Sequence, residues 1–202
     1  MSKIAVDVVL LPSEEVMDIT IAANEELLKQ YPDKIILNKE NCLPHISLAM
    51  GCISQSHISD AGEILTSIAE KYSPETLKII GFSTSTNSIG EKVTVAIIEK
   101  TGALQSLHEE VMEKLAQYFD YDITENMLLS EKVDESTLLW IKNFPEKSSF
   151  KKYYPHITLG YGLLEKFPFS GNCEVSTLAM CHLGNHCTCR KVIALMELIN
   201  PK

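Results

Sequence analysis

A five-residue pattern that occurs twice constrains the fold of this chain more than any other feature. Residues 44–48 read Pro-His-Ile-Ser-Leu, and residues 155–159 read Pro-His-Ile-Thr-Leu. Successive side chains of a strand point to opposite faces, so each copy presents an imidazole and a hydroxyl on one face and two large apolar side chains on the other. Two buried strands whose histidines are satisfied in the core would give the same alternation. The matched repetition of the polar face favours a shared functional site instead.

The rest of the chain predicts strands and helices in a mixed order. Apolar alternation indicates strands at about residues 4–12, 42–53, 76–86, 92–100, 175–183 and 187–198, besides the strand of the second motif. Helical periodicity indicates helices at about 14–30, from Ser56 or Asp60 onward, at 101–119 and at 136–143. Residues 120–135 and 167–171 are typical of loops, and Gly184-Asn185 fits a two-residue hairpin turn.

This order predicts an α+β protein with two mostly antiparallel sheets and flanking helices. The two motif strands fall in different halves of the chain, so a bilobal arrangement around a central cleft would bring them together. We therefore expect residues 1–202 to form a single domain of two lobes. His108 lies beside the apolar stripe of the helix at 101–119, a position that is typical of a structural core residue.

Charge and composition exclude some classes of partner. The 202 residues carry 18 basic and 27 acidic side chains, a net charge of −9, which gives no general attraction to long duplex nucleic acid. Asp7 interrupts the apolar N-terminal run, and no run approaches the ~18 residues of a membrane span, so we expect no membrane association. Without an export signal, the six cysteines are expected to stay reduced in a monomeric, cytoplasmic protein.

Two imidazoles and two hydroxyls, if they meet, suit acid and base chemistry on a phosphodiester without a metal or another cofactor. One neutral histidine, His45 or His156, would take a proton from water while the other, protonated, would deliver one to the departing ribose oxygen. Ser47 and Thr158 would donate hydrogen bonds to the non-bridging phosphate oxygens. The sequence does not decide which histidine is the acid. Neither hydroxyl has an evident triad partner, so we expect no protein nucleophile.

The paired tetrapeptides His-Ile-Ser-Leu at 45–48 and His-Ile-Thr-Leu at 156–159 resemble the 2H phosphoesterase superfamily, which includes RNA 2',3'-cyclic phosphodiesterases, also called 2'-5' RNA ligases. The resemblance implies a bilobal, pseudo-twofold α+β fold and metal-independent hydrolysis of cyclic or 2'-5'-linked phosphodiesters. It also implies catalytic roles for His45 and His156, with phosphate binding by Ser47 and Thr158. In the bacterial RNA-ligase-like branch an arginine often stands where this chain has Tyr161, so the substrate stays open.

The stretch before the second motif is the most basic part of the acidic chain. It contains Lys151 and Lys152 followed by the aromatic residue Tyr154. Lysines that neutralise phosphates and aromatic rings that stack on bases suit a nucleotide or a short single strand. With Tyr161 beyond the motif, these residues are the predicted substrate-binding set. A solvated loop with core aromatics would show the same composition.

A group of cysteines and histidines near the C-terminal end resembles a zinc site. It consists of Cys181, His182, His186, Cys187 and Cys189. Pairing across a turn at Gly184-Asn185 would oppose His182 to Cys187. Cysteines two apart on a strand lie about 7 Å from one another, whereas compact zinc chelation uses Cys-x-x-Cys turns. Strand packing with free thiols is therefore the favoured interpretation, and we expect no metal ligands.

These features lead to one main hypothesis and two alternatives. The main hypothesis is a phosphodiesterase that hydrolyses a 2',3'-cyclic phosphate on an RNA end or a nucleotide. A close alternative is cleavage or joining of 2'-5' linkages. A nucleotide-binding module that keeps the pocket without turnover is an alternative from a different class.

Overall fold

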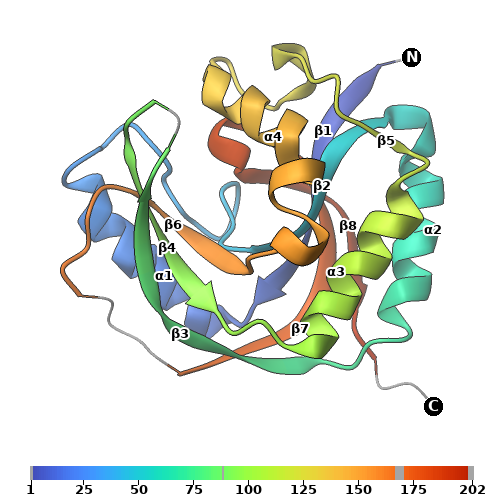
Figure 1. Ribbon diagram of the computed structural model, residues 1–202, viewed down its shortest axis with the longest axis horizontal. Coiled ribbons are helices and arrows are strands. Elements are labelled where there is room, and N and C mark those ends of the chain that lie inside the picture. Colours follow the sequence, from blue (N-terminus) through green and yellow to red (C-terminus); the bar gives the residue numbers. More distant parts are fainter. Residues whose placement is uncertain (1, 88, 167–170, 200–202) are drawn as a thin grey trace.

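The computed structural model describes residues 2–87, 89–166 and 171–199, which form an antiparallel sheet flanked by helices (Figure 1). The α-helices are α1 (Glu14–Leu28), α2 (Ile58–Ala69), α3 (Gly102–Leu115) and α4 (Glu135–Lys147). The strands are β1 (Lys3–Pro12), β2 (Ile46–Ser54), β3 (Glu75–Thr86), β4 (Lys92–Ile98), β5 (Phe119–Asp120), β6 (His156–Tyr161), β7 (Gly171–Leu183) and β8 (Cys189–Glu197). The predicted α+β class is confirmed.

The described strands form one sheet in the order β5-β2-β1-β7-β3-β4-β6, and β8 pairs with β7 outside this path. The two motif strands, β2 and β6, thus lie toward opposite ends of the sheet. They nevertheless contact each other, because the sheet curls strongly between them (Figure 1). Twist and curl of a long antiparallel sheet are what allow distant strands to approach.

One continuous sheet replaces the two sheets that the sequence predicted. The reason is the length of β7, which begins at Gly171 instead of near Val175. Its first residues pair with β3, from Glu75 to Ile79, and its remainder pairs with β1 and β8. Because a single strand belongs to both groups of strands, the sheet has no break between them.

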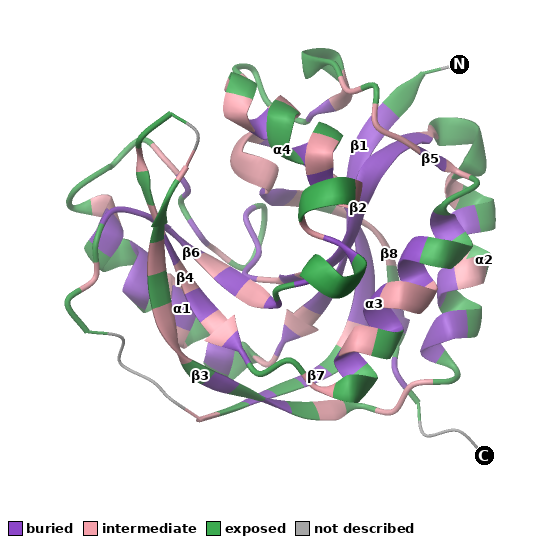
Figure 2. Ribbon diagram, viewed as in Figure 1, coloured by how far each residue is buried: buried purple, intermediate pink, exposed green. Residues whose placement is uncertain are grey.

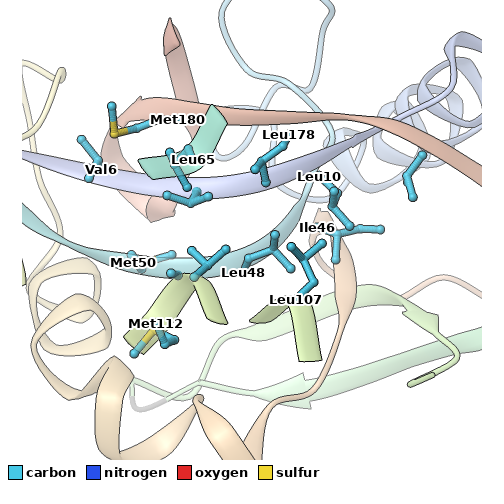
Figure 3. Packing of buried hydrophobic residues seen from close by; sticks show 14 of the residues in the cluster. Val6, Leu10, Ile46, Leu48, Met50, Leu65, Leu107, Met112, Leu178 and Met180 are labelled. Atoms are coloured by element: carbon cyan, nitrogen blue, oxygen red, sulfur yellow. The ribbon is translucent and has the colours of Figure 1, made fainter. Parts of the chain in front are cut away.

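The core lies mainly between the sheet and its helices. Helix α1 packs on β6, whereas α2 and α3 pack together against the half of the sheet that contains β2 and β8 (Figure 1). Leu48 and Met50 of β2 lie over Leu107 and Met112 of α3 (Figure 3). Strand β1 is buried on both faces over most of its length (Figure 2).

Several other element boundaries differ from the predictions, among them the start of β2 at Ile46 instead of near residue 42. Phe119 belongs to β5 and not to the preceding helix, because the chain turns after α3 and pairs with β2. Helix α4 extends on both sides of the predicted 136–143 segment, to Glu135 and Lys147. The hairpin after β7 is longer than two residues, since Leu183 pairs with Cys189. The predicted loop at 167–171 lies outside the described residues, apart from Gly171.

In the described ranges, no helix is both long enough and apolar enough to cross a membrane.

Candidate active site

The two motif histidines lie at the N-terminal ends of β2 and β6. His45 immediately precedes β2, and His156 is the first residue of β6. The alternation that the sequence predicted is present in both strands. His45, Ser47, His156 and Thr158 are half-buried, whereas the intervening isoleucines and leucines are fully buried. The apolar side chains therefore anchor each motif from behind, and the polar face stays accessible.

The same backbone contact orients both imidazoles. His45 Nδ1 lies 2.7 Å from the carbonyl oxygen of Leu43, and His156 Nδ1 lies 2.7 Å from that of Tyr154. A carbonyl oxygen only accepts, so Nδ1 carries the hydrogen in each ring. In the neutral rings Nε2 is thus the unprotonated nitrogen, which can act as a base or, after protonation, as an acid.

The electrostatics of the two rings are coupled. Burial, against the opposing effect of the Leu43 carbonyl and together with positive charge on His156, lowers the pKa of His45 to about 4. Burial also lowers the pKa of His156, which the hydrogen bond to Tyr154 opposes. Both rings are therefore neutral in the free protein near pH 7. A bound phosphate anion would favour protonation of the ring that faces it.

The two motif hydroxyls are in different situations. Ser47 Oγ donates to Asp7 Oδ2 over 2.6 Å. Within the described ranges, the Thr158 hydroxyl has no hydrogen-bond partner, so it is available to a ligand without breaking a contact. The site is thus asymmetric: Thr158 is ready to donate, whereas Ser47 would exchange a carboxyl partner for a phosphate oxygen.

Asp7 of β1 is a site residue that the sequence did not identify. Its side chain is fully buried, and Oδ2 lies 3.8 Å from His45 Nε2 as well as accepting from Ser47. Burial raises the pKa of Asp7 well above its ordinary value of 3.8, against the effect of the Ser47 hydrogen bond. An acid that interrupts an otherwise apolar strand was the signal in the sequence, because a buried carboxyl needs a reason.

Both motif strands carry a β-bulge at the same position. In β2, Ala49 pairs with Val8 and Ser47 pairs with Val9, so Leu48 is the extra residue. In β6 the corresponding extra residue is Leu159. A bulge re-aims the side chains that follow it, so both motifs end in a local change of direction.

The second bulge decides where Tyr161 points. Simple alternation would place it on the face opposite Thr158. Thr158 pairs with Val95 and Tyr161 pairs with Val93, so the bulge returns Tyr161 to the motif face. There the buried Tyr161 hydroxyl lies 3.0 Å from His186 Nδ1, and Lys34 lies over its ring.

The residues of the basic stretch have different neighbours. Tyr154 is exposed, and its ring centroid lies 5.8 Å from that of His156. Lys151 is exposed, whereas Lys152 Nζ donates to the backbone oxygen of Glu146. Of the predicted substrate-binding residues, Tyr154 is therefore the one that lies next to a motif histidine.

The C-terminal cysteines and histidines do not converge on one point. His182 Nε2 contacts the backbone oxygen of Met127, and His186 faces Tyr161. The predicted opposition of His182 to Cys187 is wrong, because the longer hairpin pairs His182 with Lys191. These two histidines are thus held by different neighbours, away from a common centre.

A different set of possible metal ligands does converge in the described part of the chain. Ligand atoms of Asp7, His45 and Cys189 lie within 4.8 Å of one another. A metal ligand must be deprotonated, whereas burial raises the pKa values of both Asp7 and Cys189. We assign no metal to these residues.

Comparison with known folds supports the architecture. The structure of TT0787 from Thermus thermophilus has a TM-score of 0.63 with 16% sequence identity, covering 96% of this chain and 98% of that chain. The apo form of E. coli LigT has a TM-score of 0.55 with 11% identity, covering 99% and 100%. E. coli LigT in complex with 3'-AMP has a TM-score of 0.53 with 12% identity, covering 98% and 100%. At these identities the likeness shows the fold.

Sequence comparison identifies the family directly. No curated protein matches the chain. The model of the 2'-5' RNA ligase superfamily matches residues 28–168, a stretch that contains both histidine motifs. Because this match covers well over half of the chain, the protein belongs to the 2'-5' RNA ligase superfamily, whose members have phosphodiester chemistry in common.

Proposed function

We propose that the protein hydrolyses a 2',3'-cyclic phosphate, at an RNA end or on a nucleotide, with His45 and His156 as its base and acid. One observation carries the proposal. The Nδ1 atoms of both rings are held at 2.7 Å by a backbone carbonyl two residues upstream, which leaves both Nε2 atoms for proton transfer. The charge coupling between the rings supports their action on one substrate.

The lowered pKa values suggest how the roles divide. His45, with a pKa of about 4, is neutral at physiological pH and suits the base that accepts a proton from water. As the water oxygen bonds to phosphorus, the bond from phosphorus to a ribose oxygen breaks. His156, protonated beside the phosphate anion, gives its proton to that ribose oxygen, so the protons balance. Each transfer contributes on the order of 10² to 10⁴ in rate.

The hydroxyls and Tyr154 complete the proposed site. Negative charge grows on the non-bridging oxygens in the transition state, where Thr158 and Ser47 would donate hydrogen bonds. Tyr154 is exposed beside His156 and would stack on the base of the substrate. The related E. coli LigT has been solved with 3'-AMP, which supports a small nucleotide or an RNA end as the ligand.

The family name favours a second candidate, the cleavage or joining of 2'-5' linkages. The same acid and base pair would serve this reaction, because it also exchanges a ribose oxygen at phosphorus. Product analysis with a nucleoside 2',3'-cyclic phosphate and with a 2'-5' oligoadenylate separates the two activities. Binding of 3'-AMP without turnover of either substrate would favour a nucleotide-binding module.

Alanine variants of the two histidines test the proposal. We expect His45→Ala and His156→Ala each to reduce cyclic phosphate hydrolysis by at least about 10²-fold, since each removes one proton transfer. His57→Ala is the matched control, because His57 is an exposed histidine outside the site. Circular dichroism verifies that the variants fold. Full turnover in either folded motif variant would refute the assignment.

A further inference from the structure

The structure contains a pocket of about 440 Å³ whose lining lies outside the two motif strands. Its walls come from three segments that are distant in the sequence, within residues 33–42, 130–134 and 185–190. A volume in this range is typical of small-molecule sites and would hold part of a nucleotide. No step of the proposed reaction uses this pocket.

The pocket holds the single arginine of the chain, Arg190. Arg190 is half-buried, and its positive charge opposes the rise that burial causes in the pKa of the Cys42 thiol. Among the described residues, no carboxylate forms an ion pair with Arg190 or with Lys132, which is exposed on the same pocket. A guanidinium has five donors, so most of its hydrogen-bonding capacity is open to an anion.

The other charged groups of the pocket are more nearly balanced. Lys34 is held by Glu91 at 2.9 Å and by Asp134 at 3.5 Å, so its charge is already compensated. Asp134 also lies 3.6 Å from His186 Nε2. Asp33 is the remaining acid of the lining. The lining therefore carries three cations, Lys34, Lys132 and Arg190, against two acids, an excess of one positive charge in a protein whose net charge is −9.

Two residues of the pocket lining, Cys42 and His186, connect it to the motif residues. Cys42 lines the pocket three residues before His45. His186 lines it as well and contacts the hydroxyl of Tyr161, which the bulge in β6 places on the face of Thr158. A ligand whose phosphate lies between the motif histidines would thus extend naturally toward Arg190.

The wall at 185–187 is built from strained backbone. His186 and Cys187 have φ angles of 58° and 55°, a region that non-glycine residues rarely adopt. The Asn185 side chain secures this loop by accepting from Asp134 N at 3.0 Å and from Thr137 Oγ1 at 2.8 Å. Strained backbone of this kind gathers at ligand sites, and here it aims His186 into the pocket.

From these contacts we infer that the pocket binds a second phosphate of the substrate through Arg190 and Lys132. The inference rests on the proposed function and names its substrate more closely. If the cyclic phosphate of a terminal nucleotide lies between His45 and His156, the second phosphate is the 5'-phosphate of that nucleotide. In RNA this group is the linkage to the preceding nucleotide. The protein would then prefer an RNA 3' end to a free nucleoside cyclic phosphate.

Two inert ligands that differ by one phosphate test the inference. Calorimetry compares the affinity for adenosine 3'-monophosphate with that for adenosine 3',5'-bisphosphate. We expect the wild type to bind the bisphosphate about tenfold more tightly, the effect of one charge-assisted contact. Arg190→Met should reduce this ratio to about two or less, because the charge is lost. Arg190→Lys should retain most of it, which verifies that the site survives substitution.

Lys114→Met is the matched control, since Lys114 is an exposed cation near the end of α3, and it should leave the ratio unchanged. Equal affinities in the wild type, or an unchanged ratio in Arg190→Met, would overturn the inference. The outcome is distinguishable from failure of the proposed function. A wild type that hydrolyses no cyclic phosphate but shows the tenfold ratio refutes the reaction and leaves the phosphate site standing.

Discussion

His108 of α3 donates from Nδ1 to the carbonyl oxygen of Leu48 over 2.6 Å, and this contact holds the bulge in the first motif strand. The bulge removes that carbonyl from the regular ladder, so another donor must satisfy it. The other nitrogen of the ring, Nε2, accepts from Phe150 N over 2.7 Å. His108 is therefore a structural residue, as its position on the helix predicted, and it links α3 to both β2 and the segment before β6.

Asn24 of α1 does the same for the second motif. Its Nδ2 donates to the carbonyl oxygen of Leu159 over 2.7 Å, and Oδ1 accepts from Leu37 N. Gly160 follows at φ 143°, where a Cβ atom would lie 2.8 Å from Asn24 Nδ2. A helix side chain thus fixes each bulge, and each bulge fixes the end of one histidine motif.

Removal of the His108 side chain is expected to destabilise the protein. His108→Ala leaves the Leu48 carbonyl and the Phe150 amide without partners in a buried environment and removes the ring that stacks on Tyr153. We expect a loss of roughly 2 to 4 kcal/mol in the free energy of unfolding. Urea unfolding measures it, with His57→Ala as the exposed control. A loss no larger than that of the control would show that the bulge needs no donor.

The pH dependence of hydrolysis follows from the two lowered pKa values. The base form of His45 appears as pH rises through about 4. The acid form of His156 is lost as pH rises through its own pKa, which burial places below the ordinary 6.5. Because kcat/KM reports the free protein, its maximum should lie below pH 6.5. A pH series of kcat/KM checks this, and a maximum on the alkaline side of neutrality would contradict it.

The two hydroxyls should respond differently to substitution. Thr158→Ala removes a donor that is free in the described structure, so it should lower kcat/KM by about 10²-fold or more and leave stability unchanged. Ser47→Ala removes the hydroxyl that donates to the buried Asp7 carboxyl, so it should also lower the free energy of unfolding by about 1 to 3 kcal/mol. Kinetics and urea unfolding on both variants separate these effects, and Thr158→Ser should keep activity. Equal stability losses would show that the Asp7 contact is not the difference.

Substitution of Asp7 should stabilise the protein at neutral pH. The native state keeps Asp7 protonated above pH 3.8, whereas the unfolded chain ionises it, so wild-type stability falls as pH rises through the window between the unfolded and the native pKa. Asp7→Asn avoids this loss and still accepts from Ser47. Its advantage should grow by up to about 1.4 kcal/mol per pH unit in that window. Unfolding at several pH values measures it, with the exposed Asp60→Asn as control. A constant difference would refute the raised pKa.

Tyr154 should contribute to binding through its ring. Tyr154→Ala is expected to weaken nucleotide binding by about 1 to 3 kcal/mol, the contribution of one stacked base, whereas Tyr154→Phe should bind normally. Its backbone carbonyl, which orients His156, remains in both variants. Titration with adenosine 3'-monophosphate measures the affinities. Equal weakening in both variants would assign the effect to the hydroxyl instead.

Local patterns predicted the elements well because they depend on neighbours in the sequence. The strand at β1 and the helix at α1 begin within a residue or two of their predicted positions, and the alternation of His45 with Ser47 is confirmed. Phe119 was misplaced because its spacing continues the helical stripe of α3, whereas pairing with β2 holds it in β5. Pairing with a strand that is distant in the sequence therefore outweighed the helical spacing of the apolar residues.

The sequence by itself determined the two polar motifs, their alternation and the family to which they belong, since side-chain chemistry and strand period are local properties. Only the tertiary structure decided what surrounds them. It brought the buried carboxyl of Asp7 to Ser47 and His45, and it turned Tyr161 to the motif face through a bulge. It also placed Arg190 in one pocket with Cys42 and His186. These relations depend on strand register and sheet curl, which arise from contacts between distant residues and leave no periodic signal in the chain.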